Sequence, residues 1–487
     1  MVLLGDKAIG RASEVFAQAD LGDPRRTRRA VGITAALARR PRESLPHVWN
    51  TPAELEAGYR FLRNPKCEFS ALLEPYQHLT RQRALEHGQV LVLHDTTDVA
   101  CQAAEPEEVG FLQTGKPGFF VHHALCIAAD ETRRPLGMLW SQLWGRAKRS
   151  LGRKRNLSGS ELSKLDERES DRWLEGVTQA ELWADGCQQV VHVMDREADS
   201  FRLFEHLQQL QADFVVRLRH DRSTEDGTVA ESLSMAELKL ERLVPLSKRK
   251  RRSEPRYTHQ GRPARMARLK VRCQSVELQP PSYLKKTHDP VQVQLVQVLE
   301  EDPPQGEEPV SWVLATSLPV RTKADVQGVI DIYRARWVIE EFHKALKTGC
   351  MFEKRQLESF ESITTLLALS YPVACEILRV RSRARQPGLP ASDVLSPTQL
   401  QCLRHFPRAP QLPDEPTAQQ ALDAIAALAG HIKNNGPPGW QKLAAGFREL
   451  LAFEQGWISK DDLLTAAKPL GKNAYGAYLR QIAGEAE

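Results

Sequence analysis

Three acidic residues of this chain stand where carboxylates could do chemistry. Asp95 lies in the apolar run LVLHDTTD, Asp195 follows the run VVHVM where a strand gives way to a helix, and Glu340 lies on a long helical segment. Polar ligands bind at the carboxyl ends of strands in α/β sheets. If the three acids converge, their charges repel one another unless they share a cation. An all-oxygen ligand set favours Mg²⁺ or Mn²⁺.

The helical segment that holds Glu340 has a polar face. A capping-box pattern at Thr322 and Asp325 predicts its start, and Gly349 predicts its end, so a helix is expected at about 323–347. At about 100° per residue, four polar side chains fall within an arc of roughly 60°. These four are Tyr333, Arg336, Glu340 and Lys347. The face is either a surface that binds phosphate and metal or a solvated face with intrahelical ion pairs, and geometry alone leaves both open.

Other polar residues near the acids are interpreted as structural. Three further acids are expected to be turn or helix-start residues that favour the helix dipole, namely Asp98, Glu197 and Asp199. Three histidines could ligate a metal but are expected to be packing residues of strands, namely His94, His122 and His123. None of the six is assigned chemistry.

The elements that must position these residues alternate between strands and helices. Residues 1 to about 68 are predicted to be helical. Three β-rich runs follow, QVLVLHDTT, GFFVHHALCIA and PLGMLWSQLW, and then a helix at about 160–183. The strand VVHVMD, the helix SFRLFEHLQQL and the strand DFVVRLR come next. The first three strands should form an antiparallel meander and the later ones should add in parallel, which is typical of a ribonuclease-H-like α/β fold.

The remaining chain departs from this alternation. Residues from about 221 to 318 carry period-two runs such as RMARLKVRCQSVEL and VQVQLVQVLE, which indicate a β-rich insertion. Beyond Pro372 the chain is predicted to be helical, with a Pro-rich link at 386–415 and a turn at 434–438.

Length and composition indicate a soluble protein of two or three domains. At 487 residues the chain is too long for one compact core. No apolar run approaches the roughly 18 residues that a membrane span needs, and the N-terminal segment lacks the features of a secretory signal. The eight cysteines are scattered without a CxxC pair. They are expected to be reduced, which indicates a cytoplasmic protein without a structural zinc site.

Basic residues are gathered in four clusters, although the net charge is only +5. The clusters are Arg25, Arg26, Arg28 and Arg29; Arg146, Lys148, Arg149, Arg153, Lys154 and Arg155; Lys248, Arg249, Lys250, Arg251 and Arg252; and Arg262, Arg265, Arg268 and Lys270. Any single cluster could simply solvate a surface. Four clusters on a nearly neutral chain favour a polyanion that contacts several domains, and we expect nucleic acid.

The motifs around the three acids resemble those of the DDE transposases of the bacterial insertion-sequence-four group. HDTT contains Asp95, MDREAD contains Asp195, and YRARWVIEEFHKALKTG contains Glu340 at the family's Tyr-Arg-Glu-Lys spacing. The likeness continues in order through LGDPRRTRR, GYRFLRNP, ERESDRW, FVVRLRH and GRPAR. It covers about residues 10 to 365 and thins beyond, where GHIKNNGPPGWQKLAAGF is the clearest match.

The resemblance implies three parts. They are an N-terminal helical DNA-end-binding domain (1–68), a ribonuclease-H-like catalytic domain (69–365) with the β-rich insertion at about 221–318, and a C-terminal helical dimerisation domain (366–487). In that fold the first and fourth strands are neighbours, so Asp95 and Asp195 would lie side by side. With Glu340 they would bind two Mg²⁺ ions, for which Mn²⁺ could substitute.

The resemblance also implies contacts with double-stranded DNA. Positions that match contacts to transposon ends are Arg25, Arg26 and Arg29, and those beside the scissile phosphate or the flipped base are Arg217, Arg219, Tyr333, Arg336 and Lys347. Trp312 would stack on a base flipped out of the end, although core packing in a strand is the alternative reading. The implied partners are transposon ends, target DNA and a second copy of the chain in a homodimeric synaptic complex.

The implied activity is cut-and-paste transposition through a hairpin intermediate. Two other functions fit the same residues. One is a two-metal nuclease of the same fold that releases cut ends without joining them. The other is a catalytically idle DNA-binding repressor descended from a transposase.

Overall fold

Along the chain, a first group of helices is followed by the strands of a long sheet and then by a second group of helices. The fold is taken from a computed structural model, which describes residues 4, 6–101, 104, 106–146, 171–246, 248–249, 252–254, 257–259, 261–384, 388–406, 409–431, 442–443, 445–447 and 449–450. Several predicted features lie outside these residues: most of the second basic cluster, Lys250 and Arg251 of the third, the helix at 160–170, and the turn at 434–438.

The N-terminal part is helical, as predicted. Its helices are α1 (Asp6–Ser13), α2 (Pro24–Arg39), α3 (Leu45–Val48), α4 (Pro52–Leu62) and α5 (Phe69–Leu85). Asp23 caps α2, because its side chain accepts a hydrogen bond from the Arg25 backbone N–H at 2.8 Å. Ile33 and Leu37 bury one face of α2, which leaves the arginines on the opposite, exposed face. The helix α5 was not predicted, and it contains Pro75.

One mixed sheet of eleven strands runs through the protein. Its strands are β1 (Val90–Ala100), β2 (Gly118–Ala128), β3 (Pro135–Trp144), β4 (Val190–Met194), β5 (Asp213–Arg217), β6 (Ser223–Thr224), β7 (Gly227–Thr228), β8 (Leu238–Leu246), β11 (Arg265–Leu278), β12 (Val291–Leu299) and β13 (Ser311–Thr316). The order is β3-β2-β1-β4-β5-β13-β12-β11-β6-β7, with β8 paired to β11. A separate hairpin joins β9 (Arg252–Glu254) and β10 (Tyr257–His259).

The sheet confirms the predicted pairing of its first five strands. β1, β2 and β3 pair antiparallel, and β4 and β5 add in parallel beside β1. The β-rich insertion then continues the same sheet, since β13 pairs with β5. This mixed α/β architecture with helical flanks is that of a ribonuclease-H-like fold.

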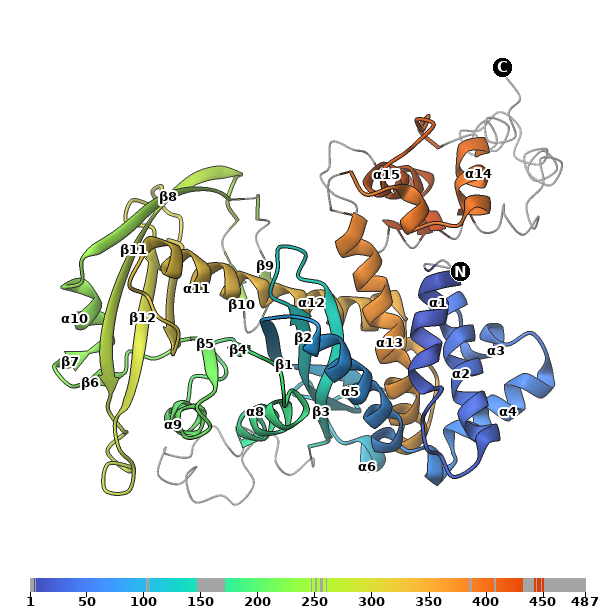
Figure 1. Ribbon diagram of the computed structural model, residues 1–487, viewed down its shortest axis with the longest axis horizontal. Coiled ribbons are helices and arrows are strands. Elements are labelled where there is room, and N and C mark those ends of the chain that lie inside the picture. Colours follow the sequence, from blue (N-terminus) through green and yellow to red (C-terminus); the bar gives the residue numbers. More distant parts are fainter. Residues whose placement is uncertain are drawn as a thin grey trace.

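Helices cover both faces of the sheet. The helices α8 (Asp171–Trp183) and α9 (Phe201–Gln209) lie below the strands in Figure 1. Two further helices, α6 (Pro106–Val109) and α10 (Val229–Ser234), are short. Above the strands lie α11 (Lys323–Ala335) and α12 (Trp337–Lys344). Side chains of a strand alternate between faces, so the central strands contribute buried apolar residues to one cluster on the face of α11 and α12 and to two others on the face of α8 and α9.

The predicted long helix is broken and ends differently from a regular α-helix. Its start has the predicted capping box between Thr322 and Asp325. The helical hydrogen bonding is interrupted at Arg336, between α11 and α12. The last turn, η5 (Ala345–Gly349), is a π-helix, and Met351 beyond it has a left-handed backbone with φ of 51°. The last turn, which contains Lys347, therefore departs from the regular rotation of about 100° per residue that the prediction assumed.

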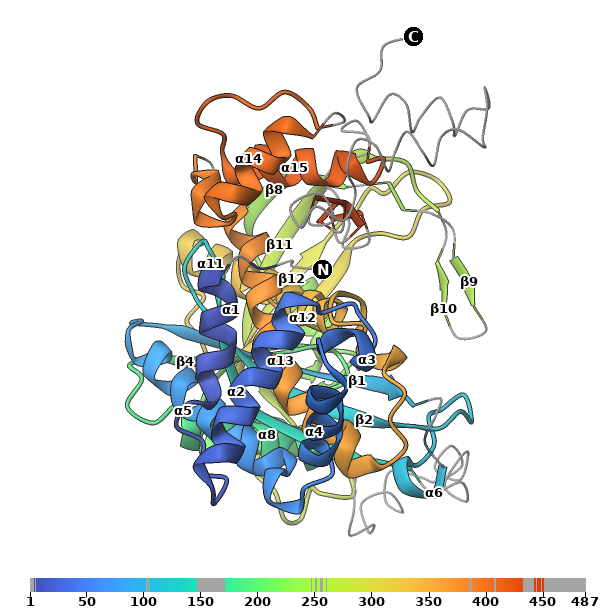
Figure 2. The same ribbon diagram turned by 90° about the vertical axis from the view of Figure 1, so that its right-hand side faces the viewer.

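A single helix, α13 (Phe360–Ala384), packs against N-terminal helices, central elements and a C-terminal helix. It contacts α1, α2 and α4, as Figure 2 shows, and also η5, β3 and α15 (Ala418–Leu428). It includes Pro372 in its interior and crosses the predicted boundary at residue 365. The span Phe360–Val380 is long and apolar enough to cross a membrane, whereas the sequence analysis expected no such run. Its most apolar 18-residue stretch is, however, 94% buried inside the protein. It is therefore a core helix.

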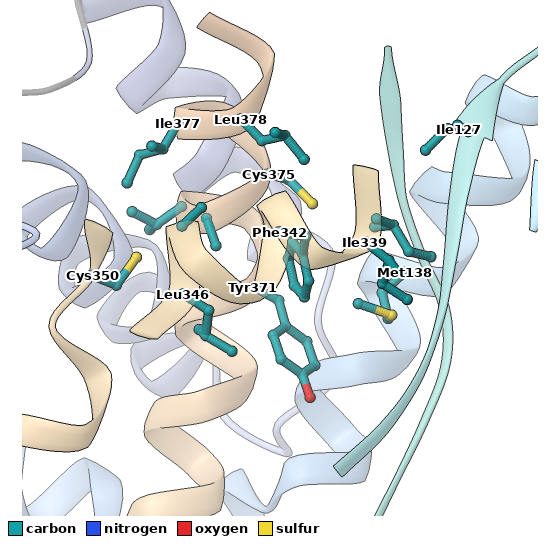
Figure 3. Packing of buried hydrophobic residues seen from close by; sticks show 14 of the residues in the cluster. Ile127, Met138, Ile339, Phe342, Leu346, Cys350, Tyr371, Cys375, Ile377 and Leu378 are labelled. Atoms are coloured by element: carbon teal, nitrogen blue, oxygen red, sulfur yellow. The ribbon is translucent and has the colours of Figure 1, made fainter. Parts of the chain in front are cut away.

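Aromatic and aliphatic side chains join α13 to α12 and η5. Figure 3 shows Phe342 of α12 near Tyr371 and Cys375 of α13, and Ile339 of α12 beside Met138 of β3. The region 386–415, predicted to be a loose link, contains the helix α14 (Pro397–His405) and the short turn η7 (Ala391–Asp393). Ser396 starts α14 with a capping box, a local signal that the proline content obscured.

Candidate active site

The sheet register sets the first two acids side by side. Leu93 of β1 pairs with Val193 of β4 in a parallel ladder. Asp95 and Asp195 each follow two residues later, at the same level and on the same face. Asp95 is still within β1, whereas Asp195 lies directly after the end of β4, where its Oδ1 accepts a hydrogen bond from the Glu197 backbone N–H at 2.8 Å.

Arg336 connects the third acid to the first. Its Nη1 lies 3.3 Å from Asp95 Oδ2, and its Nη2 lies 2.6 Å from Glu340 Oε1. The Arg336 side chain is 13% exposed and that of Asp95 17%, so the contact is largely shielded from water. The guanidinium thus lies between carboxylates from a strand and from a helix that are separated by 245 positions in the sequence.

The charge balance of this cluster is uneven. Burial raises the pKa of Asp95 to about 7, and repulsion from Asp195 and Glu340 adds to that rise, whereas Arg336 opposes it. For Arg336, attraction to Asp95, Asp195 and Glu340 raises the pKa above its ordinary value although burial acts against it. The three acids therefore lie within electrostatic range of one another, and one arginine does not neutralise them.

The donor set fits a hard divalent cation in its chemistry. All three side chains offer carboxylate oxygen, the ligand type that Mg²⁺ and Mn²⁺ prefer. Within the described part of the chain, however, no group of three or more His, Cys, Asp and Glu side chains lies in an arrangement that could hold a metal ion. Arg336 lies between two of the acids, Asp95 and Glu340.

Tyr333, Trp312 and Arg217 lie along the same face of the sheet. The rings of Trp312 and Tyr333 meet edge to face, with centroids 5.3 Å apart. Trp312 is half-buried, so it belongs neither to the fully buried core nor to the open surface. Arg217 donates from Nη2 to the Ser311 carbonyl at 3.1 Å. Burial raises the pKa of the Tyr333 hydroxyl, and Arg217 opposes that rise.

Two other predicted contacts lie further from the acids. Lys347 Nζ is 2.9 Å from Asp98 Oδ1 and 3.5 Å from Glu353 Oε1. Arg219 is exposed, and its backbone N–H donates to Asp199 Oδ2 at 2.6 Å. Lys347 therefore forms ion pairs with two acids other than the three candidate catalytic ones.

The neighbouring acids have structural contacts, some of which differ from the prediction. Asp98 lies in strand β1 and pairs with Lys347, so it is neither a turn nor a helix-start residue. Asp199 is buried and accepts hydrogen bonds from the backbone N–H groups of Arg219 and His220. Only Glu197 lies in an exposed turn, as expected.

The strand histidines are fully buried packing residues, as predicted, and they divide between the two faces. On the α8 face, His94 Nε2 bonds to His192 Nδ1 at 2.8 Å, and His122 Nδ1 bonds to Thr96 Oγ1 at 2.8 Å. On the acid face, His123 Nδ1 lies 3.1 Å from His343 Nε2. His343 Nδ1 is in turn 3.9 Å from Asp95 Oδ2. The sequence prediction missed His343, although its place one helical turn after Glu340 was a signal.

The exposed face of α2 borders a basic cavity of about 430 Å³. Residues that line it include Arg25, Arg28, Arg29, Arg39, Trp49, Asn50 and Glu54. Arg26 differs from its neighbours, since its Nη1 donates to the Leu21 carbonyl at 2.7 Å. Two of the three arginines predicted to contact DNA therefore face this cavity, and the third braces the start of the helix.

Basic residues of the insertion are mostly neutralised within the protein. Arg265 pairs with Glu300 and Glu307, Arg268 with Glu241, and Lys270 with Glu301. The fourth predicted cluster is therefore an ion-pair network on neighbouring strands, which weakens the case for it as a polyanion surface.

Two segments of the chain match models of known families. Residues 11–67 match the family model described as transposase DNA-binding, and residues 173–371 match the one described as transposase DDE domain. Together the two matches support a DNA transposase. The part that would do chemistry is a DDE domain, which includes Asp195 and Glu340. Asp95 and strands β1 to β3 lie ahead of the second match and are tied to it by the sheet.

Proposed function

We propose that the protein is a cut-and-paste DNA transposase of the insertion-sequence-four group, similar to the transposase of transposon five. The observation that supports the proposal is the approach of three acids, in which Arg336 contacts both Asp95 and Glu340, and repulsion from Asp195 and Glu340 adds to burial in raising the pKa of Asp95 to about 7. Carboxylates that repel one another are stabilised when they share a divalent cation. The two family matches support the same class.

Asp95, Asp195 and Glu340 are the proposed ligands of two Mg²⁺ ions, for which Mn²⁺ could substitute. Such a pair of ions, when bound, would activate an attacking hydroxyl and stabilise the leaving oxygen of an in-line displacement. Arg336 would release Glu340 as the ions bind and turn toward the phosphate backbone, for which a guanidinium is well suited. Tyr333 and Lys347 would hold the same backbone on either side.

The basic cavity beside α2 is the proposed contact with transposon ends. Arg25 and Arg29 are exposed there, and cations that meet phosphates displace counterions, so end binding should weaken as salt rises. Arg26 would act by holding the helix in place. Arg217, Arg219 and Trp312 would contact DNA nearer the acids, and a second copy of the chain would complete a synaptic dimer.

The proposed reaction has four in-line phosphoryl transfers at one site. Water first cuts one strand and leaves a 3′-hydroxyl. This hydroxyl attacks the opposite strand to form a hairpin, and a second water opens the hairpin. The same hydroxyl then attacks target DNA. Each step breaks one P–O bond and forms another: attack by water leaves a 5′-phosphate and a free 3′-hydroxyl, and attack by the 3′-hydroxyl exchanges one phosphodiester for another, so no covalent enzyme intermediate is required.

An in vitro strand-transfer assay tests the proposal. Purified protein is incubated with labelled transposon-end DNA, a supercoiled target plasmid and Mg²⁺, with an EDTA reaction as control. Joined products, with a hairpin species at early times, are expected. Cleaved ends that are never joined would instead indicate a nuclease of the same fold, and binding without cleavage would indicate a repressor.

A further inference from the structure

A chain of buried polar side chains leads from the core of the protein to Asp95. Ser141 Oγ lies 2.8 Å from the Tyr371 hydroxyl, which lies 3.0 Å from His123 Nε2. His123 Nδ1 lies 3.1 Å from His343 Nε2, and His343 Nδ1 lies 3.9 Å from Asp95 Oδ2. The first four residues are buried and come from β3, α13, β2 and α12. Four separate elements therefore converge behind one carboxylate.

Only one direction of donation satisfies the whole chain when it ends on a carboxylate. A carboxylate only accepts hydrogen bonds, so His343 must donate from Nδ1 and accept at Nε2. His123 then donates from Nδ1 and accepts at Nε2 from the Tyr371 hydroxyl, whose oxygen accepts from Ser141. This assignment requires both imidazoles to be neutral. Burial favours the neutral form of each, since it lowers the pKa of both His123 and His343.

The position of Tyr371 argues against an ordinary packing role. Its ring lies in the apolar cluster with Phe342, and Figure 3 shows the hydroxyl oxygen at the edge of that cluster. A phenylalanine would fill the same space without needing a polar partner. The hydroxyl is instead hydrogen-bonded on both sides, to His123 and to Ser141.

His343 approaches the carboxylate oxygen that Arg336 also contacts. The other oxygen, Oδ1, is held by the Thr96 backbone N–H at 2.9 Å. The 3.9 Å gap from His343 Nδ1 to Oδ2 is longer than a hydrogen bond, and active-site hydrogen bonds often tighten only when the reacting partners bind. Arg336 Nη1 and His343 Nδ1 both approach Oδ2, at 3.3 Å and 3.9 Å, so His343 would remain beside this oxygen if Arg336 turned toward DNA.

We propose that His343, oriented by His123, Tyr371 and Ser141, is a positioning residue that fixes the Asp95 carboxylate for divalent-ion binding. The inference rests on the proposed function, because Asp95 is taken there as a metal ligand. Groups that hydrogen-bond to a metal ligand orient it, and losing one commonly costs 10- to 100-fold in metal affinity or activity. Loss of this row of hydrogen-bonded side chains should therefore change the metal concentration that the reaction needs more than it changes the affinity of the protein for DNA.

The test compares His343→Phe, His343→Asn and Tyr371→Phe with the unchanged protein. Mn²⁺ binding to the full chain on transposon-end DNA is measured by electron paramagnetic resonance of free Mn²⁺, alongside the Mn²⁺ concentration for half-maximal nicking. We expect His343→Phe to raise the Mn²⁺ dissociation constant and the Mn²⁺ concentration for half-maximal nicking about 10- to 100-fold. Tyr371→Phe should raise the same two quantities by a smaller factor. His343→Asn should recover part of the loss, because its amide can reach the place of Nδ1. If His343→Phe does not fold, Tyr371→Phe decides alone, since it removes a single oxygen atom.

His122→Asn is the matched control. His122 is the residue before His123, is equally buried and bonds to Thr96 beside Asp95, but it lies on the opposite face. It should lower thermal stability and leave the Mn²⁺ requirement unchanged. Metal curves for His343→Phe and Tyr371→Phe that coincide with the His122→Asn curve would overturn the inference.

Asp95→Asn separates this inference from the function on which it rests. Loss of Mn²⁺ binding and nicking in Asp95→Asn supports the metal site whatever the histidine variants do. Unchanged Mn²⁺ binding in Asp95→Asn would overturn the proposed function itself.

Discussion

The two faces of the central sheet hold similar residues in different arrangements. Each face has buried histidines and is covered by helices: His94, His122 and His192 lie on the α8 face, and His123 and His343 lie on the acid face. On the α8 face, His192 bonds to His94 and to Glu181 at 2.7 Å, so the network ends on an acid of the covering helix. On the acid face, the His123–His343 pair ends on Asp95 instead.

The difference follows from the alternation of side chains along a strand. His122 and His123 are adjacent in sequence, but they project to opposite faces, where His122 meets Thr96 and His123 is opposite Asp95 in the ladder. Close approach of α8 at Gly176 seals the first face, since a Cβ there would lie 3.2 Å from His94 Nδ1 and 3.3 Å from His122 Nε2. The same residue type is thus structural on one face and adjacent to the candidate active site on the other.

The largest expected effect comes from neutralising Asp95, the carboxylate at which the His123–His343 pair ends. Asp95→Asn should lower nicking by about 10³-fold or more, because a site built for charge loses a metal ligand. Thr96→Val, one residue away on the α8 face, should keep activity within about threefold. Gel analysis of nicked end DNA measures both. Comparable losses in the two variants would mean that the faces are not functionally distinct.

Trp312 tests how far the active face extends along the sheet. Stacking on a flipped base is worth about 1–3 kcal/mol, so Trp312→Ala should slow hairpin formation by about 10- to 100-fold while first-strand nicking continues. Time courses on denaturing gels resolve the two steps. Equal slowing of nicking and hairpin formation would assign Trp312 to packing against Tyr333.

The α8 face should respond in stability without a change in chemistry. His192→Leu leaves His94 and Glu181 without a buried partner, which should reduce the free energy of unfolding by about 1–3 kcal/mol. Urea unfolding measures this loss. The Mn²⁺ requirement for nicking, measured below the unfolding transition, should match that of the unchanged protein, and a shift in that requirement would show that the two networks are coupled.

The pH dependence of stability sharpens the comparison further. The pKa of Asp95 is raised to about 7 in the metal-free fold, against about 3.9 in an unfolded chain. The folded protein therefore binds this proton more tightly, so its stability should fall as pH rises from about 4 to about 7 and then level off. Melting temperatures in EDTA should show this fall relative to Asp95→Asn. Parallel curves for the two proteins would contradict the assignment.

Much of the fold is readable from the sequence because its strands are short apolar runs between turn residues. GFFVHHALCIA and PLGMLWSQLW became β2 and β3 with the predicted ends. The helix α5 was missed because Pro75 interrupts it. The continuation of the central sheet into the insertion was also missed. Nothing in the sequence of β13 indicates that its partner is β5.

The candidate site was only partly predictable for a related reason. Local motifs identified Asp95, Asp195 and Glu340, and the parallel register explains how the first two come together. Arg336 was predicted to face DNA, but its contact with Asp95 joins residues 241 positions apart, which no local pattern encodes. The regular rotation of about 100° per residue, on which the predicted place of Lys347 was based, does not hold through the π-turn that contains it.

The shared helix α13 has a consequence for dissecting the protein. Glu376 within it accepts hydrogen bonds from Arg11 of α1 at 2.8 Å and from Arg379 at 2.9 Å, and Arg379 also donates to the Pro135 carbonyl at the start of β3. A fragment that stops at residue 365 would lack Glu376 and Arg379. It would therefore lose the buried contacts of α13 with α1 and with β3. Shortened versions of the chain should therefore retain residues through at least 384, and the end-binding and catalytic parts should melt together in one transition.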